Sequence, residues 1–199
     1  FGLTPGLAKK MASRFGQINV SIDGVGEAYE DTRGWNGAAL GLRALDLLVA
    51  AGARVGVNTV MSGPMLARPD ALEAIGAAIA HAGATEWQWL RFKPTGRGAT
   101  SWEALSPTPA QLDALWDRSL ALEASTGLTI RWDCAMTPWI ADRVDAVERA
   151  ARLGVAGCPG GERLWSRHAN GTAAPCSFAE GSVVPAGLDL QRPPAVVPG

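Results

Sequence analysis

The sequence is poor in cysteine, in net charge and in long apolar segments, and each shortage excludes a class of protein. Three cysteines among 199 residues argue against a disulfide framework and leave metal binding or buried thiols. A formal net charge of -1 provides no basic field for nucleic acid or an anionic membrane. No apolar run approaches the roughly 20 residues that span a bilayer, and a signal peptide is lacking. We therefore expect a cytoplasmic protein without nucleic-acid or membrane partners. Because the first residue is Phe1, we also expect a piece of a longer chain.

Strand-like and helix-like segments alternate over the first two thirds of the chain. Helical patterns cover residues 38–51, 67–83 and 106–127, each ending at or next to a glycine that can stop a helix. The β-branched and aromatic enrichment of strands marks residues 18–23, 54–61, 86–92 and 128–133. This order predicts an α/β fold with a parallel sheet and crossover helices, either open or bent toward a barrel. The stretches 24–37 and 93–98 are predicted to be loops.

The pattern changes after Cys134. One more helix is expected over residues 137–154, and the residues beyond it are short, glycine-rich segments without helical periodicity. Asn170-Gly171 lies between two strand-like runs and predicts a β-hairpin, because both residues accept positive φ. We therefore predict two domains, residues 1–153 and 154–199. The proline-rich tail after Glu180 is predicted to be coil.

Polar side chains follow the first predicted strand. Alternation along a strand puts Ser21 and Asp23 on one face, so both can reach the same polar ligand, for instance a sugar diol. The pattern fits equally well an Asp23 side chain that only caps the following turn.

The cysteine spacing is the other chemical signal. Cys158 is followed after twelve residues by Gly171, and Cys176 follows after four more. A hairpin that turns at the glycine brings the two thiolates together, as a tetrahedral metal site or an iron-sulfur cluster requires. Cys134 is the remaining thiol and the candidate third ligand. Two alternatives stay open: buried thiols without metal, and a non-catalytic α/β binding module with a structural zinc at the three cysteines.

Three motifs resemble a known family. The segment VSIDG (20–24), the RG pair at Arg33 and the helix and strand of residues 37–61 resemble the middle of a radical S-adenosylmethionine enzyme. The stretch from Cys158 to Cys176, with Pro175 before the second cysteine, resembles the start of a SPASM or twitch extension. This resemblance covers roughly residues 1–180 and implies a partial (β/α) barrel followed by a small β-hairpin iron-sulfur extension.

The resemblance also implies cofactors and roles. Ser21, Asp23 and Arg33 match positions near S-adenosylmethionine, and Cys158 and Cys176 match ligands of an auxiliary [4Fe-4S] cluster, with Cys134 as a candidate partner. The implied enzyme is an iron-sulfur oxidoreductase or maturase that uses a 5'-deoxyadenosyl radical to abstract hydrogen from a peptide or small molecule. An electron donor protein would be its partner. The family's C-x3-C-x2-C loop is missing, so we expect the chain alone to be inactive.

Overall fold

The computed structural model describes residues 2–139, 148, 151 and 157–179 of the chain. It contains two compact units, residues 1–156 and 157–199. The helix predicted over residues 137–154 lies largely outside the described residues, and the coil predicted after Glu180 lies entirely outside them. Among the described helices, none combines the length and apolar character that crossing a bilayer requires.

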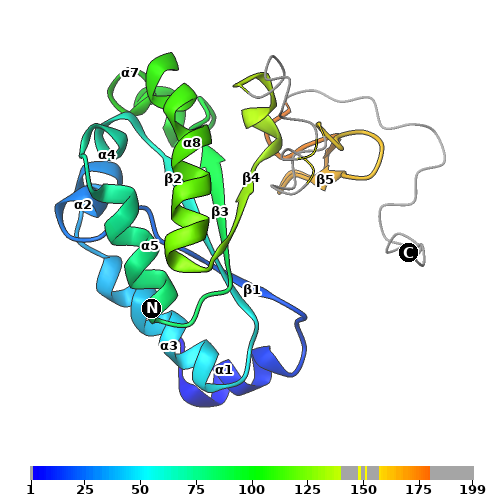
Figure 1. Cartoon of the computed structure of the whole chain (residues 1–199). Coiled ribbons are helices and arrows are strands. Elements are labelled where there is room, and N and C mark those ends of the chain that lie inside the picture. Colours follow the sequence, from blue (N-terminus) through cyan, green and yellow to red (C-terminus); the bar gives the residue numbers. More distant parts are fainter. Residues whose placement is uncertain (1, 140–147, 149–150, 152–156, 180–199) are drawn as a thin grey trace. The chain divides into compact units, whose positions relative to one another are not determined.

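The first unit is built on a four-stranded sheet (Figure 1). All strand pairs are parallel, and the order across the sheet follows the sequence: β1 (Ile18–Ser21), β2 (Val55–Met61), β3 (Glu86–Arg91) and β4 (Thr129–Trp132). The predicted α/β fold with a parallel sheet is therefore confirmed. Closure of this sheet into a partial barrel remains a prediction.

Long helices lie along one face of the sheet, and short ones gather near its carboxyl edge (Figure 1). The long helices are α1 (Pro5–Ala12), α3 (Ala38–Ala50), α5 (Ala71–His81) and α8 (Pro109–Thr126). The short ones are α2 (Glu27–Arg33), α4 (Gly63–Ala67), α6 (Arg97–Thr100) and α7 (Trp102–Leu105), and a 3-10 helix, η1 (Cys134–Trp139), follows β4.

The two faces of the sheet differ in chemistry. Val57, Trp87 and Ile130 are paired across neighbouring strands and are all 0% exposed, so they form the face covered by helices. On the opposite face the strands carry partly exposed polar side chains, among them Asn58 and Arg131. The hydrophobic effect therefore fixes which side of each strand faces the helices, because a one-residue slip would reverse every side chain.

The helix α8 shows why the long helices begin and end where the sequence predicts. Thr108 accepts a hydrogen bond from the Gln111 amide, and the Gln111 side chain accepts one from the Thr108 amide, which makes a capping box. Gly127 ends the helix with a φ of 72°, a left-handed conformation that favours glycine.

Two predicted loops contain helices instead. Within residues 24–37, the helix α2 spans Glu27–Arg33, so the loop prediction is wrong there. Burial of Ala28 and Tyr29 and a left-handed Gly34 at the C-terminus favour this short helix, although it offers too few residues for a periodic signal. Within residues 93–98, α6 begins at Arg97.

The second unit contains a short antiparallel hairpin of β5 (Ser166–Arg167) and β6 (Ala173–Ala174). Its turn is at Asn170-Gly171, where Gly171 has a φ of 87° and the Asn170 side chain accepts a 3.0 Å hydrogen bond from the Thr172 amide. The predicted hairpin is confirmed, with strands of two residues each.

Candidate functional site

The carboxyl ends of the parallel strands meet at one edge of the sheet, and the candidate site lies there. Asp23 follows β1 by two residues, Phe92 directly follows β3, and Asp133 directly follows β4. In open α/β sheets this edge is where ligands bind, because the loops that leave the strands are free to vary.

A cavity of about 390 Å³ opens at this edge. Its volume falls in the range of small-molecule sites, roughly 300 to 1,000 Å³. The lining comes from the loop after β1, α2, the loop after α2, β2, the residue after β3, α6, the junction between α6 and α7, and α7. The lining residues are Asp23, Thr32, Arg33, Trp35, Val60, Phe92, Gly98, Ser101 and Leu105. The structure thus brings Asp23 and Arg33, two of the residues expected from the sequence, into one site. Ser21 is exposed at the end of β1 and is not among the lining residues.

Asp23 and Arg33 form an ion pair within this cavity. The Arg33 Nε atom donates to Asp23 Oδ2, while Asp23 Oδ1 accepts a 2.6 Å hydrogen bond from the Val60 amide. The Asp23 side chain is 1% exposed and the Arg33 side chain is 39% exposed. The buried carboxylate is therefore compensated on both oxygens, as a buried charge requires.

The glycines around this pair explain the local chain path. A side chain at Gly24 would place its Cβ 2.5 Å from the Ala28 carbonyl carbon, and Gly24 has a φ of 154°. Only glycine allows the loop after β1 to approach the start of α2 so closely. Gly34 ends α2 with a φ of 74°, directly after Arg33. Both glycines of the DG and RG motifs thus fix the positions of the two charged residues.

Polar contacts tie α2 to α4 and hold the wall of the cavity. Arg68, at the end of α4, donates to Asp31 at 2.8 Å and to Glu27 at 3.1 Å. Hydrogen bonds to Asp31, and then to Glu27, raise the pKa of Arg68 above its ordinary value. The Thr32 and Ser62 hydroxyls also share a 2.7 Å hydrogen bond. These contacts limit movement of the helix that carries Arg33.

Aromatic rings form another part of the cavity lining. Trp35 lies edge-on to Tyr29 at a centroid distance of 5.9 Å, and Phe92 stacks on Trp102 at 5.8 Å with an interplanar angle of 18°. Trp35 belongs to the loop that the sequence already marked, but sequence reasoning missed Phe92, Thr32 and Ser101. The position of Phe92 at the end of the strand predicted over residues 86–92 was the one available signal.

A second ion pair lies at the same edge. Lys93 Nζ pairs with Asp133 Oδ2, and Asp133 Oδ1 accepts a 2.9 Å hydrogen bond from the Ala135 amide. Asp133 thus caps the turn that opens η1. Lys93 and Asp133 therefore bind each other at the carboxyl ends of β3 and β4.

In the second unit, Cys158 and the residue before Cys176 both contribute atoms that pack closely around Gly160. A Cβ atom at Gly160 would be 3.2 Å from the Cys158 sulfur and 3.1 Å from the Pro175 carbonyl oxygen. The Cys158 sulfur and the Pro175 carbonyl oxygen therefore both border Gly160. Cys176 accepts a 3.5 Å hydrogen bond from the Phe178 amide, and Cys158 is exposed.

No three His, Cys, Asp or Glu side chains gather as a metal site within the described part of the chain. A [4Fe-4S] cluster needs four ligands, so the described residues do not supply its full set. Cys134 lies in the first unit, at the start of η1. Its assignment as a third ligand remains a prediction.

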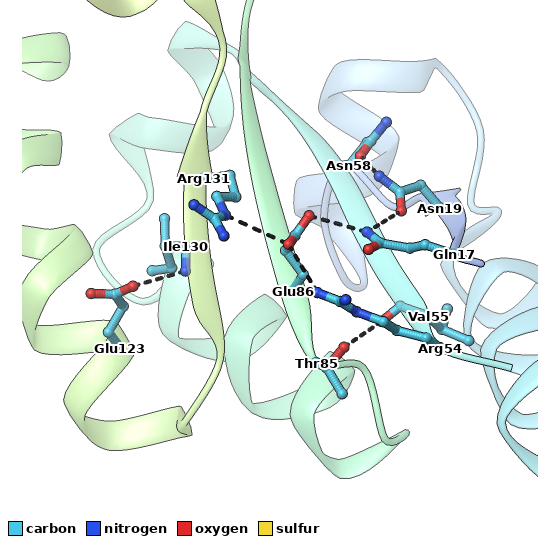
Figure 2. A network of polar contacts seen from close by, with 10 residues as sticks. All are labelled: Gln17, Asn19, Arg54, Val55, Asn58, Thr85, Glu86, Glu123, Ile130 and Arg131. Carbon is cyan, nitrogen blue, oxygen red and sulfur yellow. Dashed lines mark hydrogen bonds and ion pairs between the residues drawn. The ribbon is translucent and has the colours of Figure 1, made fainter. Parts of the chain in front are cut away.

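A polar network covers the open face of the sheet, at the end of the strands opposite the cavity. Figure 2 shows Glu86 at its centre. Glu86 accepts a 3.1 Å hydrogen bond from Gln17 and forms ion pairs with Arg54 at 3.7 Å and Arg131 at 3.5 Å. Because these contacts connect residues in or beside all four strands at their amino ends, we interpret them as support for the sheet.

Comparison with known proteins identifies relatives of this chain. The chain is 35% identical over 112 residues to mycofactocin maturase MftC of Mycobacterium ulcerans (strain Agy99), covering 55% of this chain and 29% of that protein. It is 33% identical over 120 residues to the MftC of Mycolicibacterium smegmatis, covering 58% of this chain and 29% of the relative. These relatives are radical S-adenosylmethionine enzymes. Over these 112 to 120 residues the chain is similar to these maturases. No family model matches the chain.

The predicted resemblance to radical S-adenosylmethionine enzymes is confirmed by the similarity to these relatives over 55% to 58% of the chain. The chain spans about 29% of the length of the curated relatives it matches. The cavity at Arg33 combines a guanidinium, hydroxyl groups and aromatic rings within a volume suited to a small molecule the size of a nucleoside.

Proposed function

We propose that this chain forms part of a radical S-adenosylmethionine enzyme that modifies a peptide. The homology to mycofactocin maturases supports this class of activity. The observation that carries the proposal within the structure is the cavity in which Asp23 and Arg33 come together at the carboxyl edge of the sheet. A small-molecule substrate is the alternative to a peptide, and an electron donor protein is the proposed partner.

S-adenosylmethionine, when bound and reduced, supplies the capacity to abstract a hydrogen atom from the substrate. The chain's own residues bind the cofactor and exclude water from it. Arg33 provides positively charged hydrogen-bond donors at the cavity wall, and Thr32 and Ser101 add hydroxyl groups. Trp35 and Phe92 provide apolar surface for a planar ring. Ser21, exposed at the end of β1, is proposed as a further polar contact.

The second unit is proposed to hold an auxiliary iron-sulfur cluster. The support is the confirmed hairpin, a glycine at position 160 that both the Cys158 sulfur and the Pro175 carbonyl oxygen border, and an amide that donates to the Cys176 sulfur. Backbone amides often donate to cluster thiolates and influence their potential. Cys158 and Cys176 are two candidate ligands, with Cys134 as the third. The alternative, a structural zinc in a binding module, gains no separate support from the described residues.

Binding of S-adenosylmethionine to the chain tests the proposal directly. Isothermal titration calorimetry should detect binding to the wild-type chain and a loss of about tenfold in affinity in Arg33→Gln, because one charge-assisted contact is lost. Arg43→Gln is the matched control, since Arg43 is on α3 and is not among the lining residues. Equal affinity in both variants would contradict the assignment of this cavity.

The enzyme activity needs a separate measurement. In the enzyme that contains this segment, Arg33→Gln should reduce formation of 5'-deoxyadenosine from S-adenosylmethionine under anaerobic, reducing conditions. An enzyme that forms no deoxyadenosine in its wild-type form, despite a full iron content, would refute the proposed class.

A further inference from the structure

The Asp23 carboxylate is enclosed by protein and has donors on both oxygens. Its side chain is 1% exposed, Oδ1 accepts a 2.6 Å hydrogen bond from the Val60 amide, and Oδ2 pairs with Arg33 Nε. The sequence left open whether Asp23 touches a ligand or only caps the following turn. The structure directs both of its oxygens toward other parts of the protein.

Arg33 is in the opposite situation. Its side chain is 39% exposed and lines the cavity, and only its Nε atom is engaged by Asp23. A guanidinium carries five N–H donors in a rigid plane. With Nε held by Asp23, the two terminal nitrogens are the donors available to the cavity. Fixing one edge of a planar group fixes the direction of its other edge.

We propose that Asp23 is a positioning residue that acts through Arg33. Asp23 orients the guanidinium so that its terminal nitrogens bind two adjacent oxygen atoms of the molecule in the cavity. Such paired oxygens occur in a carboxylate and in a vicinal diol. This inference rests on the proposed function for the identity of the ligand. The orientation of Arg33 by Asp23 can be measured without any ligand.

The surrounding structure supports a positioning role. The backbone on either side of the pair is fixed by the close approach at Gly24 and by the left-handed Gly34. The helix that carries Arg33 is further held by Arg68 through Asp31. Because the loop and the helix are both anchored, loss of the Asp23 charge should release the Arg33 side chain without moving its backbone.

The first experiment measures hydrogen exchange of arginine Nε–H groups by NMR in the ligand-free chain. We expect the Arg33 Nε–H to exchange at least about tenfold more slowly than that of Arg43, since a hydrogen bond to a buried carboxylate protects it. In Asp23→Asn the Arg33 rate should approach the Arg43 rate, while Arg43 stays unchanged. Equal rates for the two arginines in the wild-type chain would overturn the positioning role.

The second experiment is a double-mutant cycle on S-adenosylmethionine affinity. Asp23→Asn and Arg33→Gln should each weaken binding about tenfold. The double variant should bind no more weakly than Arg33→Gln alone, because Asp23 acts only through Arg33. Losses that multiply to about 100-fold would mean that Asp23 contacts the ligand itself.

A third measurement separates the two sources of paired oxygens. 5'-Methylthioadenosine keeps the ribose diol and lacks the carboxylate of S-adenosylmethionine. If Arg33 binds the diol, Arg33→Gln should weaken both probes equally. If it binds the carboxylate, only S-adenosylmethionine should be affected. No effect on either probe would overturn the assigned ligand chemistry.

Thermal unfolding of each variant checks that the variant is folded. If Asp23→Asn fails to fold, Arg33→Lys takes its place in the affinity comparison. A lysine keeps the charge and lacks the Nε contact, so it should lose affinity as Arg33→Gln does. Full affinity in Arg33→Lys would contradict the need for an oriented guanidinium. If the wild-type chain binds neither probe, the proposed function and the ligand class fail, whereas the exchange rates still decide the positioning role.

Discussion

Replacing Gly24 by alanine tests why position 24 needs glycine: because a side chain has no room there, because the backbone conformation disfavours other residues, or for both reasons. The new Cβ would lie 2.5 Å from the Ala28 carbonyl carbon, a backbone atom of α2 that cannot rotate away. Gly24 also has a φ of 154°, which disfavours alanine. Both effects act on the loop that carries Asp23, so the substitution should destabilise the fold and loosen the site.

The size of the effect follows from its parts. Overpacking against fixed atoms costs roughly 1 to 3 kcal/mol, and an unfavourable backbone conformation costs roughly 1 to 3 kcal/mol. The smaller conformational freedom of alanine in the unfolded chain offsets about 0.4 to 1 kcal/mol. We expect a net loss of about 3 kcal/mol in the free energy of unfolding. For a chain of this length, that corresponds to a decrease of roughly 6 to 12 °C in Tm.

Two control glycines separate the contributions. Gly127 has a φ of 72°, and an added Cβ there would meet nothing within 4 Å, so Gly127→Ala should show strain alone, about 1 kcal/mol. Gly6 lies in α1 with no close neighbour and no positive φ, so Gly6→Ala should raise stability by about 0.5 kcal/mol. Urea and thermal unfolding of the three variants give the comparison. A Gly24→Ala loss no greater than that of Gly127→Ala would refute the role of the close approach.

Two further predictions concern the polar network and the cysteines. Glu86→Gln should lower the free energy of unfolding by about 1 kcal/mol, and less at high salt, because it removes the charge that two arginines share as an ion-pair partner. The control is Glu103→Gln, on an exposed residue of α7, which should change the free energy of unfolding little. Equal losses in the two variants would contradict the network. After anaerobic reconstitution with iron and sulfide, Cys158→Ser and Cys176→Ser should each bind less iron than the wild-type chain, since thiolates are cluster ligands. Iron content that is the same in all three would count against the auxiliary cluster.

Much of the fold could be predicted from the sequence because its signals are local. The buried strand around Val57 and the helix α8 combine periodicity with clear end signals at Thr108 and Gly127. The hairpin at Asn170 was equally predictable, since its turn places Gly171 at a φ of 87° and uses the Asn170 side chain as a hydrogen-bond acceptor. The short helix α2 was missed, because seven residues give too little periodicity and its stability comes from burial against the rest of the unit.

The candidate site was predictable only in part. The motifs marked Asp23 and Arg33, but not that Asp23 would be enclosed with both oxygens engaged. The Val60 amide that binds Asp23 belongs to a different strand, 37 positions along the chain. Likewise Phe92 and Ser101 reach the cavity from segments distant in sequence from Arg33.

The sequence alone determined the order of the four strands and of the helices α3, α5 and α8, the polar and apolar sides of each strand, and the hairpin turn, because these depend on neighbouring residues and on solvent. Tertiary structure alone decided which charged groups are buried, which are paired and which line the cavity. Those outcomes depend on the pairing of β1 with β2 and on the packing of α2 against α4. A carboxylate next to a guanidinium and a second strand's amide has a different chemistry from the same carboxylate at the surface.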